Sequence, residues 1–126
     1  MADVMALLKQ MRNASGAPET LGLPDDVISR FVEIDKTLTQ AIEEASVKQK
    51  QLSDTDLMMN ESELVEKLQH DFVNFYAPAT VNPYVAIAGR GPWIVTSHGA
   101  VLHDNGGYGM LGGGHGPSEI ISVMSE

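Results

Sequence analysis

The sequence contains no cysteine, which excludes disulfide bonds and thiolate metal sites. Basic residues are also scarce, because eight lysines and arginines stand against seventeen acidic residues and give a net charge of −9. Since they form no cluster, binding to nucleic-acid phosphates or to anionic membranes is disfavoured. The chain also lacks an apolar run long enough to cross a bilayer, and its start lacks the pattern of an export signal. These absences predict a cytoplasmic protein.

The charges that are present lie mostly in the first part of the chain. Residues 1–70 hold thirteen acids and seven bases, whereas residues 71–126 hold four acids and a single base, Arg90. A chain of 126 residues with 43% apolar residues can form one modest core. We therefore expect a solvated N-terminal helical segment, residues 1–80, and a more covered segment, residues 81–126.

Apolar residues recur at three- and four-residue steps in the N-terminal segment, which predicts amphipathic helices. Proline at the first position of a helix, followed by acidic residues, favours a helix start at Pro24. We predict one helix over residues 1–12, a second from Pro24 to about Lys50, and a third that begins at Ser53 or Asn60 and ends at Pro78. The apolar stripes of these helices are interpreted as core packing.

After Pro83 the apolar pattern becomes that of extended chain. Short strands are predicted at 84–88, 93–97 and 100–103, and a helix at 118–124. His98-Gly99 is predicted to be a two-residue hairpin turn, because glycine there can take a positive φ. The predicted class is α+β, with N-terminal helices followed by a small antiparallel hairpin sheet and a glycine-rich loop.

The glycine-rich loop contains seven glycines between Gly106 and Gly116. Ordering glycine costs more backbone entropy than ordering any other residue, so such a run indicates positive φ angles or close approach of a ligand or chain. The short helix predicted after it needs tertiary support to be stable. We therefore expect this sequence to be part of a larger protein; a complete small domain with a frayed C-terminal tail is the alternative.

Gly107, Gly109 and Gly112 match the spacing of a dinucleotide-binding motif. In that motif the third glycine already lies in a helix that follows a parallel strand. Here further glycines and Pro117 delay the helix, and the preceding strand belongs to a predicted hairpin. The match is therefore not interpreted as a nucleotide site.

Other catalytic and metal patterns are weak. His98, His103 and His115 with Asp104 match no local spacing of metal ligands, so no metal site is predicted. Ser97 and His98 are neighbours on a turn and are expected to point in different directions, so they are not interpreted as a nucleophile and its base. No lysine lies in the apolar second part. No catalytic residue is predicted within this chain.

Aromatic residues are the remaining candidates for a binding site. Tyr84, Trp93 and Tyr108, with Met110, can wall a small-molecule pocket on a glycine backbone. For Trp93 the other interpretation is a core residue of the hairpin.

The order of residues from Tyr84 to Met124 resembles the N-terminal segment of class III pyridoxal-phosphate aminotransferases. The similarity lies in the glycine pair Gly89-Arg-Gly91, a hairpin that turns on glycine, an aspartate after its second strand, and a Gly-His-Gly-Pro element before a helix. The upstream helices are variable in that family. One departure concerns the loop: a single residue separates His115 from Pro117, where the family usually has two.

The resemblance implies that this chain is roughly the first quarter of an α/β enzyme of fold type I. It implies a homodimer that binds pyridoxal 5′-phosphate, an amino donor and an amino acceptor, and catalyses transamination or amino-group migration. Tyr108, Gly109 and Met110 are then expected to line the substrate pocket. The cofactor lysine and the phosphate-binding residues come from the remainder of the polypeptide. The alternative function is a small helical protein-interaction module without catalytic activity.

Overall fold

The computed structural model describes residues 3–70 and 83–104. Within these ranges the elements are the helices α1 (Val4–Ala14), α2 (Asp25–Ile34), α3 (Lys36–Gln49), α4 (Asp54–Met58) and α5 (Glu61–Gln69), and the strands β1 (Ala86–Arg90), β2 (Trp93–Thr96) and β3 (Val101–His103). The strands form an antiparallel sheet of order β1-β2-β3. The predicted α+β class with N-terminal helices and a small antiparallel sheet is confirmed. The predicted segment boundary, the glycine-rich loop and the helix at 118–124 lie outside the described residues.

Helix α1 forms where the sequence predicts a helix, but it runs from Val4 to Ala14 and not over residues 1–12. The side chain of Asp3 caps it by accepting hydrogen bonds from the amides of Met5 and Ala6, at 3.0 and 3.4 Å. One face of the helix is buried and packs against α3. That face carries Val4, Leu8 and Met11.

The single helix predicted from Pro24 to Lys50 is wrong, because the chain breaks at Asp35 into α2 and α3. Asp35 has extended backbone angles, and its Oδ1 accepts from the amide and hydroxyl of Thr37 at 2.9 and 2.6 Å. Its Oδ2 accepts from the indole nitrogen of Trp93 at 2.8 Å. The carboxylate therefore caps α3 and binds the sheet at the same time, which an unbroken helix would not allow.

The third predicted helix is two helices, one starting after each of the two predicted start residues, although the Asn60 side chain makes no capping hydrogen bond. Ser53 caps α4 by accepting from the amide of Asp56 at 3.1 Å, and Asn60 precedes α5. An ion pair between Asp56 and Lys67 joins the two helices, and the hydrogen bond from Lys67 lowers the pKa of Asp56. The predicted end of this helix at Pro78 lies outside the described residues.

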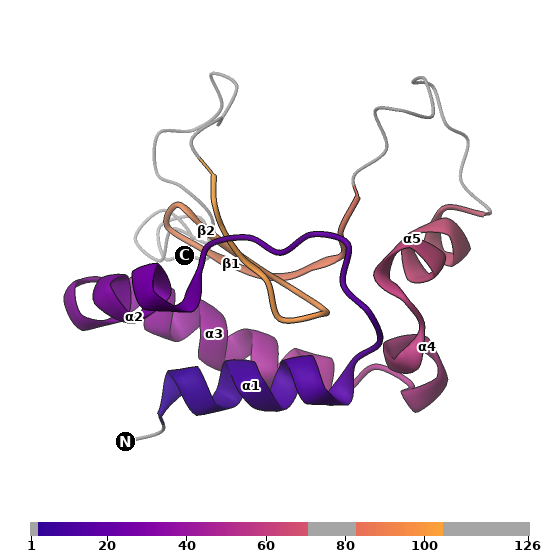
Figure 1. Cartoon of the computed structure of the whole chain (residues 1–126), viewed down its shortest axis with the longest axis horizontal. Helices are drawn as coiled ribbons and strands as arrows, with labels where there is room; N and C mark the ends of the chain where they lie inside the picture. The colour runs from indigo at the N-terminus through magenta and orange to yellow at the C-terminus, as the bar shows by residue number, and fades with distance from the viewer. Residues whose placement is uncertain (1–2, 71–82, 105–126) are drawn as a thin grey trace, which may run out of the picture.

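One core joins helices α1, α2 and α3 to the sheet. Figure 1 shows these three helices on one side of the strands. Helix α3 contacts both β1 and β2, and α1 and α2 pack beside it. The ring of Trp93 is buried and lies 5.1 Å from that of Phe31, so its interpretation as a core residue is confirmed. The buried apolar set comprises Val4, Leu8, Met11, Ile28, Leu38, Ala41, Ile42, Ala45, Ala88, Trp93, Val95 and Val101. None of the helices in the described ranges has the length and apolar character needed to cross a membrane.

Candidate functional site

The structure describes a cleft between two connecting segments. We call residues 15–24, which join α1 to α2, the strap, and residues 97–100, which join β2 to β3, the hairpin turn. The strap leaves α1, runs past the edge strand β3 and reaches α2 (Figure 1). The cleft between them has a volume of about 440 Å³. The residues predicted to line a substrate pocket, Tyr108, Gly109 and Met110, lie outside the described residues.

The hairpin turn is one residue longer than predicted. The amide of Thr96 donates to the carbonyl of Ala100 at 3.0 Å, so three residues form the loop between this pair. The amide of Gly99 donates to the carbonyl of Thr96 at 3.1 Å, and Gly99 has φ +80°. This is the common three-residue hairpin with glycine in the left-handed position. The positive φ predicted at Gly99 is therefore confirmed, and the two-residue length is wrong.

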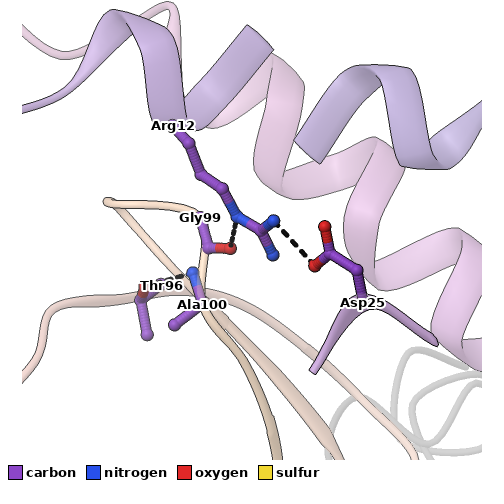
Figure 2. A network of polar contacts seen from close by, with 5 residues as sticks. All are labelled: Arg12, Asp25, Thr96, Gly99 and Ala100. Carbon is purple, nitrogen blue, oxygen red and sulfur yellow. Dashed lines mark hydrogen bonds and ion pairs between the residues drawn. The ribbon is translucent and has the colours of Figure 1, made fainter. Parts of the chain in front are cut away.

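Side chains from two helices hold the hairpin turn, which is buried along its whole length. Gln49 of α3 donates to the carbonyl of Ser97 at 2.8 Å and to that of Met11 at 2.9 Å. Arg12 of α1 donates through Nε to the carbonyl of Gly99 at 3.0 Å (Figure 2). Buried carbonyl groups require such donors, so these bonds let the turn lie inside the protein.

Ser97 and His98 contact each other, so the expectation that they point in different directions is wrong. Ser97 Oγ lies 2.9 Å from His98 Nδ1, and His98 Nε2 lies 2.8 Å from the carbonyl of Met59. Because that carbonyl only accepts, Nε2 carries a proton and donates, and in the neutral ring Nδ1 accepts from the serine hydroxyl. Ser97 is fully buried and His98 is 2% exposed. The pair is therefore placed to join the hairpin turn to the α4–α5 junction, and its hydroxyl is not accessible to substrate.

Backbone hydrogen bonds attach both ends of the strap. The amide of Gly16 donates to the carbonyl of Leu57 at 2.9 Å, and the amide of Leu23 donates to that of Val101 at 2.9 Å. Beside the second bond, Gly22 has φ +69°, and a Cβ there would lie 2.4 Å from the carbonyl oxygen of Val101. Only glycine fits at this position, because the neighbouring atom is backbone that cannot turn away.

A buried carboxylate holds the middle of the strap. Glu61, at the start of α5, accepts through Oε1 from the amides of Glu19 and Thr20 at 3.0 and 2.6 Å. Its side chain is fully buried, and its Oε2 has no hydrogen-bond partner among the described residues. The strap is thus fixed at three places, by α4, by α5 and by β3.

The cleft contains one ion pair and is otherwise mostly apolar. Arg12 Nη1 lies 2.7 Å from Asp25 Oδ1, and Nη2 has no partner among the described residues. Figure 2 shows the guanidinium between the hairpin turn and Asp25. Leu21, on the strap, is 74% exposed and lines the same cleft. The remaining apolar lining comes from Pro18, Leu23, Pro24 and Ala100.

The described residues do not form a site for a metal or for pyridoxal phosphate. Residues 3–70 and 83–104 contain no group of three or more histidine or acidic residues placed to hold a metal ion. His98 and His103 belong to these ranges, whereas His115 lies outside them. All five lysines lie within the described ranges and are exposed: Lys9, Lys36, Lys48, Lys50 and Lys67. A lysine that forms a cofactor imine needs a desolvated pocket, and none of these has one.

No protein family, curated protein or solved structure matches this chain. The cleft was not predicted from the sequence. In the sequence, Arg12 and Asp25 are ordinary charged residues of predicted helices, and Glu61 is an acidic residue in the first turn of a helix. The one available signal was the presence of glycines at Gly16, Gly22 and Gly99, all of which line the cleft.

Proposed function

We propose that the chain is the N-terminal part of a class III pyridoxal-phosphate aminotransferase, which catalyses transamination or amino-group migration. The observation that carries the proposal is the arrangement of β1, β2 and β3. Gly91 and Gly99 both have positive φ angles, of 53° and 80°, at the two turns of this sheet. In the N-terminal segment of that family, which this chain resembles, glycine stands at the same positions. The chain then acts in the cytoplasm within a homodimer, on a small amino donor and acceptor.

The proposal assigns a scaffold role to the described residues. Because all five lysines are exposed, the lysine that binds the cofactor belongs to the remainder of the polypeptide. Helices α1 to α3 support the sheet. Tyr108, Gly109 and Met110, which follow β3 in the sequence, are proposed to line the substrate pocket. Bound pyridoxal phosphate supplies the electron sink for proton transfer at the carbon next to the amino group.

Reductive trapping tests this proposal. The native polypeptide that contains this sequence is purified from its source, reduced with borohydride and digested, and the pyridoxyl group is located by mass spectrometry. We expect the label on a lysine outside residues 1–126 and no label on the five lysines within them. The 126-residue chain alone, mixed with pyridoxal phosphate, is expected to form no stable imine. A native polypeptide that carries no pyridoxyl label would refute the proposal.

A second candidate function is a helical protein-interaction module. It is favoured by large apolar side chains that are exposed on four helices and the strap: Leu21, Ile34, Val47, Met58 and Leu68. Under this proposal the native polypeptide binds a partner protein and lacks the cofactor. The same trapping experiment separates the two, because the module predicts no label on any lysine.

A further inference from the structure

We propose that the cleft between the strap and the hairpin turn is a binding site for a small neutral molecule with an apolar body and one carbonyl group. This site does not depend on the aminotransferase proposal, because every residue that forms it lies within the described ranges. Three features support this proposal: the size and lining of the cleft, the guanidinium donor of Arg12, and the charge of the cleft.

The size and lining of the cleft suit a small ligand. Its volume of about 440 Å³ is within the range of small-molecule sites, which is roughly 300–1,000 Å³. Such sites are mostly apolar with a few placed polar groups, and this cleft has prolines, leucines and glycine backbone around one guanidinium. Leu21 is 74% exposed, so a ligand that covers it removes apolar surface from water.

The guanidinium of Arg12 offers a donor that is already held in place. Its Nε is bonded to the carbonyl of Gly99 and its Nη1 to Asp25, at 3.0 and 2.7 Å. Because these two bonds fix the plane of the group, a ligand does not have to immobilise a flexible side chain. Nη2 has no partner among the described residues and can donate to a ligand carbonyl oxygen.

The charge of the cleft favours a neutral ligand over an anion. Asp25 neutralises Arg12, and these are the two formally charged side chains in the lining. A ligand carboxylate at Nη2 would place a second negative charge near Asp25, on a chain whose net charge is already −9. A cation would gain little, because the carboxylate of Asp25 is already paired with Arg12. A carbonyl oxygen accepts from Nη2 without adding a charge.

The test compares benzamide with benzoate, which share ring and shape and differ in charge. Binding is followed by the amide signals of the ¹⁵N-labelled 126-residue chain. With benzamide we expect saturable shifts of Gly16, Gly22 and Gly99, which line the cleft, while Gly91, which packs on Thr37, stays unchanged. Benzoate should bind at least about tenfold more weakly, since it adds an unfavourable charge interaction. Binding of benzoate as tight as that of benzamide, or tighter, would overturn the proposal. A shift of the Gly91 amide as large as those of Gly16, Gly22 and Gly99 would also overturn it.

Two matched variants separate cleft binding from surface adsorption. Leu21→Ala should weaken benzamide binding about fivefold, through lost apolar contact, whereas Leu68→Ala on α5 should leave it unchanged. Both side chains are exposed, so both variants are expected to fold. Arg12→Met should weaken binding about tenfold or more, by removal of a charged donor. If benzamide causes no shifts, or binds Leu21→Ala as tightly as the unchanged chain, the proposed site is wrong.

Discussion

Replacement of Trp93 by alanine is expected to lower the free energy of unfolding by about 3–5 kcal/mol. The side chain is 1% exposed and packs between Phe31 of α2 and His103 of β3, with ring centroids 5.1 and 5.0 Å away. Alanine would leave a cavity where both sheet and helices meet. Urea unfolding followed by far-ultraviolet circular dichroism measures the change. A loss below about 1 kcal/mol would show that Trp93 is not in the core.

Trp93→Phe is the matched control, because it keeps an aromatic ring and removes the hydrogen bond to Asp35. We expect a loss of about 2 kcal/mol at neutral pH, typical of a bond to a charged acceptor. The pKa of Asp35 is lowered, chiefly by the hydrogen bond from Thr37 and against the effect of burial, with Trp93 contributing further.

Because its pKa is lowered in the folded protein, Asp35 stabilises the fold at pH values above its ordinary pKa of 3.8. This stabilisation is lost as the pH falls below that value. The difference in free energy of unfolding between wild type and Trp93→Phe should therefore become smaller at acidic pH. A difference that does not change with pH would contradict the assigned hydrogen bond.

Glu61→Ala is expected to cost about 3 kcal/mol of stability. The substitution leaves the amides of Glu19 and Thr20 without their acceptor and removes a fully buried side chain. Thermal and urea unfolding both measure the loss. A change of less than about 1 kcal/mol would show that the strap does not depend on this carboxylate.

Glu61→Gln is the control for the charge. Glutamine keeps an oxygen where Oε1 accepts from the strap and replaces the unpartnered Oε2 with a neutral amide. We expect its stability to lie within about 1 kcal/mol of wild type, because an unpaired buried charge is itself costly. If Gln is as damaging as Ala, the negative charge is essential and the assignment of Oε2 as unpartnered is wrong.

Local patterns predicted the elements whose causes are local. The stripe of Val4, Leu8 and Met11 predicts α1, and Ser53 and Asn60 mark the starts of α4 and α5. The break between α2 and α3 could not be predicted in this way. Asp35 continues the polar side of a helical pattern, and its tertiary hydrogen-bond partner, Trp93, is 58 residues away in sequence.

The cleft could not be predicted because long-range contacts create it. Gly99 was assigned a positive φ from its place in a hairpin, but the partner of its carbonyl is Arg12, 87 residues away. Ser97 and His98, as neighbours on a turn, are expected from the sequence to point in different directions, but the strict alternation of side chains applies only to extended strands. A turn residue is free of this alternation, and Met59 fixes the imidazole.

The central claim is that hydrogen bonds hold the exposed strap and the buried hairpin turn firmly against the helices and the sheet. Native-state amide hydrogen exchange of the 126-residue chain tests it most directly. The amides of Leu23, Gly99 and Ala100, which donate to Val101, Thr96 and the Thr96 hydroxyl, should exchange within about tenfold of the rate of the buried α3 residue Ile42. Exchange of these three amides at the rate of an exposed loop, while Ile42 remains protected, would contradict the claim.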